Sequence, residues 1–291
     1  MRITQTMIYR NLLHGAGSLR ENIEAANRQI SSGKKLNSLA DSPSGSAELV
    51  DLRAELAGID QYRENAGSGG FFISLAESVL SSAYNIVTAI YTRGSAGASS
   101  LYNADTRAEL AKEVRSLRDE LLSLANTEAQ GRHVFAGSQV TTAPFTLSGD
   151  TVTYQGDLVQ NGIDVADGLQ VQQNVAGSTV FSKAFSTVEQ LLTALESGNQ
   201  AASQAALSQF SEALGDISKA RAELGVSLAT IQNAGTEQDA RELAIQERQG
   251  KIQDADLAEA ITRLKANETT LEATFTASTV AGQRTLFDYL A

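Results

Sequence analysis

Apolar side chains recur along this chain at alternating intervals of three and four residues, which is the spacing of helices packed side by side. One such seam covers residues 9–30 and another covers residues 257–275. Three more lie at residues 72–89, 110–124 and 207–231. Alanine, leucine, glutamate, glutamine and arginine dominate these stretches, and all five favour helix. We therefore expect a mainly α-helical protein.

Glycine-rich segments predict where the helices end. The segment NAGSGG at 65–70 is expected to separate two helices, which would make residues 47–64 a helix of their own. The segment GSAGASS at 94–100 is expected to form the turn before the next helix.

Residues 131–185 have a different pattern. Short runs rich in valine, phenylalanine, threonine and tyrosine alternate with polar residues, and glycine, asparagine or aspartate interrupts them. Period-two alternation between such turn residues is typical of antiparallel strands. This part of the chain therefore predicts a small β domain inserted between helices.

The helix before the β insertion and the helix after it must run beside one another, so the two terminal helices should also pair. The predicted fold is an elongated helical coiled-coil rod, built from both chain ends, with a small inserted antiparallel β domain. We divide it into three parts. The terminal helical assembly region is 1–64 plus 236–291, the helical stalk is 65–135 plus 186–235, and the β domain is 136–185.

The seams of the two terminal helices are the candidate contact surface between subunits. Two helices alone bury little apolar area and are marginal in water, so further subunits would supply the missing contacts. The alternative is that these helices fold back onto the stalk as an ordinary bundle. The candidate interface residues are Leu12, Leu19, Ile23, Ile30, Leu257, Ile261, Leu264, Leu271 and Phe275.

The residues that commonly carry chemistry are scarce. The 291-residue chain has no cysteine, and its two histidines, His14 and His133, lie far apart in sequence. Thiolate metal sites are thereby excluded, and zinc binding or imidazole catalysis is disfavoured. The aspartates and asparagine within 157–167 miss the EF-hand spacing and are better interpreted as turn residues. We expect no catalytic residue, no cofactor and no metal.

Charge and hydropathy disfavour two classes of partner. The formal net charge is −11, whereas nucleic-acid-binding proteins usually present a basic face. No stretch reaches the roughly 18 apolar residues that a membrane span needs. The N-terminus also lacks the apolar core of a cleaved secretory signal. On these grounds alone the chain would be cytoplasmic, with no nucleic-acid or membrane partner.

The chain ends resemble a known family. The segment NRQISSGKKLNSLADSPSGSAELVDLRAEL at 27–56 resembles the N-terminal region of bacterial flagellins and their hook–filament junction relatives. Residues 67–99 are similar to the next segment of that family, and residues 254–290 are similar to its C-terminal helix. The resemblance covers about residues 3–135 and 205–291.

Three features resemble the junction branch of this family more than flagellin. They are GRHVFAGSQ at 131–139 with PF at 144–145 and YQGD at 154–157, the ending LFDYLA at 286–291, and the shortness of the β insertion. The terminal segments alone do not separate the two branches. The β insertion is the variable part, so the family implies nothing residue by residue there.

The resemblance implies a role for the turn that follows the first helix. In this family the terminal helices pack as a coiled coil in the wall of a tubular axial assembly, and the turn lets the chain leave that layer. The implied turn residues are Gly33, Lys34, Asn37 and Asp41. Gly33 would make the bend because a residue without Cβ tolerates it best. Lys34 would lie at a subunit contact or face solvent.

The resemblance further implies a structural protein that forms a ring at the hook–filament junction. The implied partners are other copies of the chain, hook-associated protein 1, flagellin or the filament cap, and a cytoplasmic export chaperone that covers residues 254–290. It also implies export to the extracellular flagellum by the flagellar type III route, without a cleaved signal peptide. Two alternatives stay open: a short flagellin that forms the filament, and a secreted binding module or adhesin whose β domain recognises a ligand.

Overall fold

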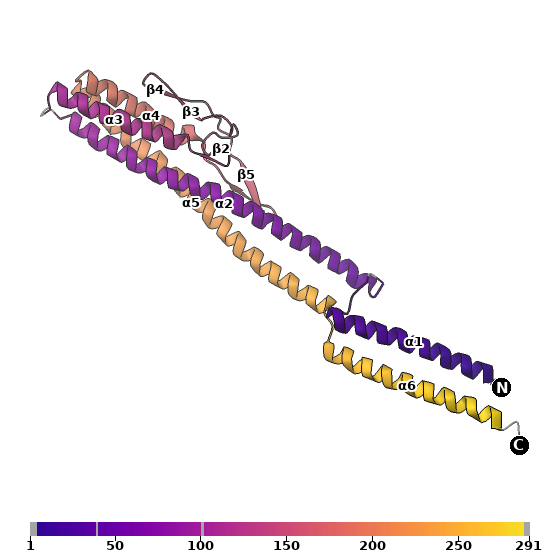
Figure 1. Cartoon of the computed structure of the whole chain (residues 1–291). Helices are drawn as coiled ribbons and strands as arrows, with labels where there is room; N and C mark the ends of the chain where they lie inside the picture. Colours follow the sequence, from indigo (N-terminus) through magenta and orange to yellow (C-terminus); the bar gives the residue numbers. More distant parts are fainter. Residues whose placement is uncertain (1–4, 39, 100–101, 288–291) are drawn as a thin grey trace. The chain divides into compact units, whose positions relative to one another are not determined.

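Six helices make up most of the chain in the computed structural model, which describes residues 5–38, 40–99 and 102–287 (Figure 1). The helices are α1 (Gln5–Ser32), α2 (Pro43–Gly97), α3 (Ala104–Ala125), α4 (Gly177–Glu196), α5 (Gln200–Gln253) and α6 (Leu257–Phe287). The strands are β1 (Glu128–Ala129), β2 (Arg132–His133), β3 (Phe145–Ser148), β4 (Thr151–Tyr154), β5 (Gly162–Ala166) and β6 (Leu169–Gln172). The predicted class, mainly α with a small antiparallel β part, is confirmed.

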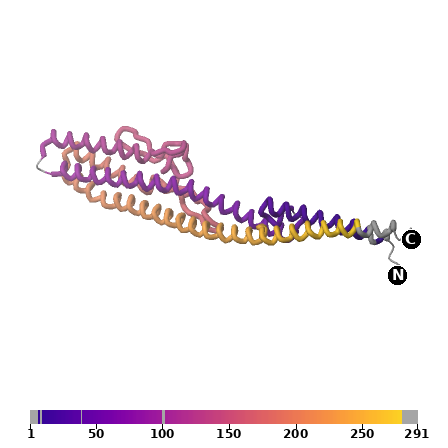
Figure 2. The backbone as a smooth tube through the Cα atoms, turned by 60° about the horizontal axis from the view of Figure 1, so that its bottom comes forward, coloured from indigo at the N-terminus to yellow at the C-terminus, as the bar shows by residue number. Residues whose placement is uncertain are grey.

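The chain divides into two compact units. Unit 1 is Met1–Ala57 with Arg241–Ala291, and unit 2 is Gly58–Ala240. In unit 1, α1 packs along α6, and Figures 1 and 2 both show these helices side by side. The division of the chain into three parts given above stays a prediction.

Unit 2 is a helical bundle that carries three small hairpins. Strands β1 and β2, β3 and β4, and β5 and β6 form three antiparallel two-stranded sheets. Phe145 pairs with Tyr154 in the second sheet, and Ile163 pairs with Val171 in the third. In the second and third hairpins at least one side chain points into the helical core, because Phe145 and Val171 are 2% and 5% exposed.

Aromatic rings join the hairpins to the bundle. Phe181 of α4 is fully buried, and its ring centroid lies 5.0 Å from that of Phe135 and 5.8 Å from that of Phe145. Both contacts are edge-to-face, the arrangement that ring quadrupoles favour. The hairpins are therefore part of one hydrophobic core with the helices.

Two expectations about element boundaries were wrong, and a third was partly wrong because α2 continues into the turn expected at 94–100 and ends at Gly97. Helix α2 continues through residues 65–70 instead of breaking there. Glycine lowers helix propensity by about 1 kcal/mol, and contacts elsewhere along a 55-residue helix outweigh that loss. Helix α4 begins at Gly177, so the end of the predicted β region is helical. Its β-branched and aromatic residues bury one helical face, with Val180, Phe181 and Ala184 each at most 1% exposed.

One window of α2 is apolar enough to resemble a membrane span, with a mean hydropathy of 1.3 over 18 residues. Within α2, the apolar side chains of Ile73, Leu80 and Ile90 are fully buried in the core of unit 2. A core helix of a bundle passes the same test of length and composition. The packing of α2 therefore accounts for its hydropathy.

Candidate assembly interface

Small residues fill the contact between α1 and α6. Its most buried side chains are Ala16, Ala26 and Ala260, which are 8%, 6% and 3% exposed. Six of the predicted interface residues are only half-buried. They are Leu12, Leu19, Ile23, Ile30, Leu264 and Leu271. The pair alone thus withdraws little large apolar surface from water.

The other three predicted residues are exposed on α6. Leu257, Ile261 and Phe275 are 47%, 43% and 45% exposed, and we call these three residues the α6 apolar row. The side chains of α6 that are buried or half-buried between positions 260 and 278 follow a different stripe. They are Ala260, Leu264, Asn267, Leu271, Thr274 and Ser278. Helix α6 is therefore rotated so that the stripe containing Ala260, Leu264 and Leu271 approaches α1 while the α6 apolar row faces outward.

The segment that follows α1 and the segment that precedes α6 are joined by backbone hydrogen bonds. Lys34 and Asp254 form an antiparallel β-bridge. The Lys35 N–H donates to the Gln253 carbonyl at 2.7 Å, and the Ala255 N–H donates to the Gly33 carbonyl at 2.9 Å. We call residues 33–38 and 40–41, together with 250–256, the clasp. It ties the end of α1 to the start of α6.

Side chains complete the clasp on the α1 side. The Asn37 Nδ2 donates to the Lys34 carbonyl at 2.8 Å. The Asp41 Oδ2 accepts from the N–H groups of Asn37 and Ser38 at 2.9 and 2.8 Å. Together these bonds fix the backbone at Lys34, Asn37 and Ser38. On the other side, Asp256 caps α6 by accepting from the N–H groups of Ala258 and Glu259.

Leu36 anchors the clasp by packing. A Cβ placed on Gly45 would lie 3.1 Å from Leu36 Cδ1 and 3.5 Å from Ile252 Cγ2. The absence of a side chain at Gly45 therefore lets Leu36 and Ile252 approach the start of α2. Substitution at Gly45 would require the Leu36 side chain and the Ser42 hydroxyl, 3.0 Å from the same Cβ position, to shift slightly.

Gly33 has a φ of +68°, in the left-handed region that ordinary residues avoid. No neighbouring atom lies within 4 Å of a Cβ placed there, so backbone strain is the whole effect of substitution. We expect Gly33→Ala to destabilise the clasp by about 1–2 kcal/mol. Gly33→Asn should have a smaller effect, because asparagine tolerates this conformation better. Hydrogen exchange of the amides at 34–41 measures the difference, and equal exchange in both variants would contradict it.

The Asp41 carboxyl makes the clasp sensitive to acid. The N–H groups of Asn37 and Ser38 lower its pKa below the ordinary value of 3.8. Because the folded state favours the charged form, the stabilising contribution is complete above pH 3.8 and is lost as the pH falls through the lowered pKa. We expect the amide NMR signals of Asn37 and Ser38 to stay constant from neutral pH to about pH 5 and to titrate together below 3.8.

The variant Asp41→Asn is the control for this titration, since it keeps the size of the side chain and removes the ionisable group. Its two amide signals should lose the acid transition. If the wild-type carboxyl titrates at or above 3.8, the hydrogen-bonded arrangement is wrong.

Comparison with known proteins identifies the family. The model described as the bacterial flagellin N-terminal helical region matches residues 3–140, and the model described as the bacterial flagellin C-terminal helical region matches residues 207–290. The chain belongs to the bacterial flagellin family. This membership was predicted from the chain ends and is confirmed.

Relatives within the flagellin family align along most of the chain. Flagellar hook-associated protein 3 of Escherichia coli K12 is 24% identical over 96% of both chains. The protein of the same name from Salmonella typhimurium is 26% identical over 94% of this chain and 95% of its own. Flagellin of Listeria innocua is 24% identical over 82% of this chain and 80% of its own. The predicted structural role in the flagellum is thereby confirmed.

Solved structures share the fold of this flagellin-family chain. A putative flagellar hook-associated protein from Vibrio parahaemolyticus has a TM-score of 0.66 at 21% identity, covering 74% of this chain and 100% of that one. FlgL of Xanthomonas campestris has a TM-score of 0.62 at 21% identity, covering 68% and 99%. At this identity the likeness concerns the fold alone.

Only one of the two segments of the clasp was predicted from the sequence. Its α1 side was predicted from glycine and the turn residues, whereas its partner segment at 250–256 was missed. A signal was available, because Asp254 and Asp256 follow Gly250 at a helix boundary and aspartate is a preferred N-cap. No sequence pattern, however, tells which segment will form a β-bridge with Lys34.

Proposed function

We propose that this flagellin-family chain is the structural adaptor between hook and filament, and that it assembles as a ring through its terminal helices. The observation that carries the assembly mechanism is the α6 apolar row. Helix α1 leaves three large apolar side chains of one helix each more than 40% exposed, although the guanidinium of its Arg20 lies 5.8 Å from the Phe275 ring centroid. Burial of apolar surface is the main driving force of protein association, so adjoining subunits would cover this row.

The position at the junction is supported by the extent of the alignments. Hook-associated protein 3 aligns over 96% of this chain, so the similarity includes the β region as well as the helical ends. Filament proteins align over less of the chain, 82% for flagellin of Listeria innocua and 90% for a filament core protein of Treponema maltophilum. Since both branches share the helical ends, similarity through the whole length favours the junction branch over a short flagellin.

The remaining parts of the proposal follow from this position. The chain carries out no catalysis; among the described residues, no group of three histidine, cysteine, aspartate or glutamate side chains could hold a metal. Its partners are other copies of itself, hook-associated protein 1, flagellin or the filament cap, and an export chaperone. It acts outside the cell after export through the flagellar channel without a cleaved signal.

Polymerisation of the purified chain tests the proposal. The protein is seeded and concentrated in salt that favours assembly, and the product is examined by electron microscopy. We expect no long helical filaments. In parallel, flagellin should grow on isolated hooks only after this chain has been added. Long filaments of the chain alone would show a flagellin, and growth of flagellin without it would exclude the junction role.

A further inference from the structure

The segment at 131–137 contains one side chain that the fold does not explain. Val134, Phe135 and Ala136 are buried in the core at 7%, 0% and 0% exposure. Gly137 has a φ of +71° and lies against Asp157. Each of these residues has a structural role. His133 has one as well, because its Nδ1 lies 3.0 Å from the Asn126 carbonyl oxygen. Arg132 is the charged side chain of the segment that is left.

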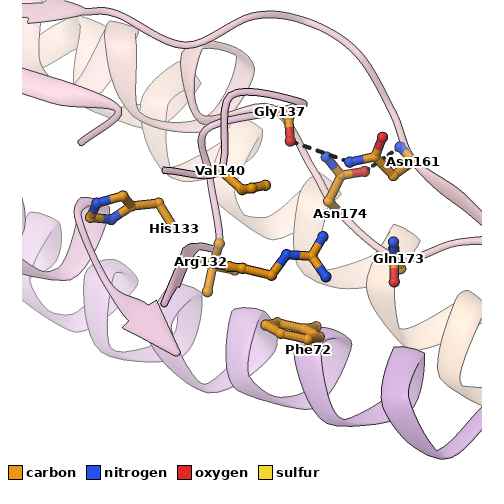
Figure 3. Close-up of a pocket in the computed structure, with 9 residues that line it drawn as sticks. Phe72, Arg132, His133, Gly137, Val140, Asn161, Gln173 and Asn174 are labelled. Carbon is orange, nitrogen blue, oxygen red and sulfur yellow. Dashed lines mark hydrogen bonds between the residues drawn. The ribbon is translucent and has the colours of Figure 1, made fainter. Parts of the chain in front are cut away.

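The guanidinium of Arg132 is held in place but not neutralised. It lies over the ring of Phe72, 5.0 Å from the ring centroid, and the side chain is half-buried (Figure 3). In the part of the chain that the structure describes, it makes no hydrogen bond and no ion pair. Stacking on an aromatic face orients the plane of a guanidinium, but its five N–H donors still require acceptors.

The guanidinium faces a small pocket without acidic residues. Its lining is Phe72, Arg132, His133, Val134, Gly137, Val140, Asn161, Gln173 and Asn174. Figure 3 shows the guanidinium between the Phe72 ring and the amide-bearing side of the pocket. The Asn161 N–H donates to Asn174 Oδ1 at 2.6 Å, the Asn161 Nδ2 donates to the Gly137 carbonyl at 3.3 Å, and the Asn174 Nδ2 donates to the Val159 carbonyl at 3.2 Å. These hydrogen bonds hold the amide side chains that line the pocket in place. Arg132 is then the charged side chain of the lining.

A pre-oriented guanidinium with free N–H donors matches a carboxylate, which can accept two parallel hydrogen bonds from it. A lone arginine binds a free carboxylate weakly, because an exposed ion pair contributes only about 0–1 kcal/mol. A carboxylate supplied by an adjoining subunit is already present at high effective concentration. The chain itself has 34 acidic and 23 basic side chains, so adjoining copies offer a surplus of carboxylates.

We propose that the Arg132 pocket binds the carboxylate of an aspartate or glutamate from an adjoining subunit; this inference rests on the proposed assembly. Arg132 makes the contact, and Phe72 is the positioning residue that fixes the guanidinium plane. The pocket thereby gives the β-bearing unit 2 its own specific contact within the ring.

The isolated protein provides the first test. In arginine-labelled protein, the Nε–H signal of Arg132 is identified by its loss in Arg132→Met, which keeps the stem on Phe72. We expect acetate to shift this signal saturably while chloride at equal ionic strength does not. Arg20 is a matched control, because it stacks on Phe275 at 5.8 Å without lining this pocket. Phe72→Leu should weaken acetate binding about two- to fivefold.

Zero-length crosslinking in assembled flagella tests the source of the carboxylate. The variant Arg132→Lys keeps the charge and supplies an amine that carbodiimide can join to a nearby carboxylate. We expect a crosslinked peptide containing position 132 and an acidic residue of an adjoining subunit, and none in Arg132→Met.

The outcomes separate this inference from the proposed function. An Arg132 signal that moves no more than that of Arg20 overturns the pocket. A specific acetate shift without any crosslink at position 132, in flagella that contain the chain, overturns the subunit source and points to a free small carboxylate. A larger response to phosphate than to acetate overturns the carboxylate assignment. Absence of the wild-type chain from flagella would refute the proposed function, whatever the NMR result.

Discussion

The substitution Ile261→Asp is expected to abolish incorporation of the chain into flagella while leaving the isolated chain as stable as wild type. Ile261 is 43% exposed on α6, so an aspartate there is solvated in the monomer and should change its stability by no more than about 0.5 kcal/mol. In the assembly the same carboxylate would be buried without a partner. An uncompensated buried charge destabilises by about 3–5 kcal/mol, and every subunit of a ring would carry it.

Two further variants serve as controls for this prediction. Leu264→Asp places the charge on the half-buried stripe facing α1, so it should loosen the α1–α6 pair itself and expose it to protease. Thr262→Asp places the charge at an exposed position outside the α6 apolar row and should incorporate normally. Flagella that contain Ile261→Asp at the wild-type level would show that the α6 apolar row is not an assembly surface.

Phe181→Ala is expected to destabilise unit 2 by about 3–5 kcal/mol. Phe181 is 0% exposed and links α4 to Phe135 and Phe145, so its loss removes apolar burial and leaves a cavity that several elements line. Chemical denaturation followed by circular dichroism measures the change. Because stability of a whole domain is commonly 5–15 kcal/mol, this loss is a large fraction of it.

Phe71→Ala is the matched control for the core substitution. Phe71 is 48% exposed on α2, so its truncation should reduce the unfolding free energy by no more than about 1 kcal/mol. Similar losses in the two variants would mean that the aromatic cluster around Phe181 is not the stabilising core of unit 2.

The helical framework was predictable because its apolar spacing is long and regular. The α1 seam is an example, since Leu12, Leu19 and Ile23 all lie on the side of α1 that α6 half-buries. Seams of this length repeat the same interval many times, so a single polar residue does not obscure them. The β region was also predictable in outline, from its alternation and its turn residues.

The rotation of α6 could not be read from the same spacing. Leu264 and Leu271 belong both to the predicted seam and to the observed stripe. The predicted seam adds the large residues of the α6 apolar row to them, whereas the observed stripe adds small and polar residues. A large-residue seam was the natural expectation. In the structure the most buried positions of the α1–α6 pair are small residues such as Ala16 and Ala260, whereas the α6 apolar row stays exposed.

The start of α4 was missed for a different reason. Its first residues include valine, two phenylalanines and threonine, which favour strands on average. The helical repeat becomes visible only when positions 180–195 are considered together. Because the predicted β region ended at residue 185, the β propensity of these residues outweighed the helical spacing of the apolar residues that follow.

The clasp has a consequence for the order in which the chain folds. The residues it joins lie far apart along the chain; the bond from Lys35 Nζ to the Lys251 carbonyl spans 216 positions. Closing so long a flexible loop carries an entropic penalty of about 5 kcal/mol, and a few hydrogen bonds do not offset it. Within unit 2, α2 and α5 already share one hydrophobic core, which includes Leu80 and Ile217, so folding of that core brings the two parts of the chain together. We therefore expect unit 2 to fold first and to shorten the loop that the clasp must close, so that the chain ends do not pair while the middle of the chain is unfolded.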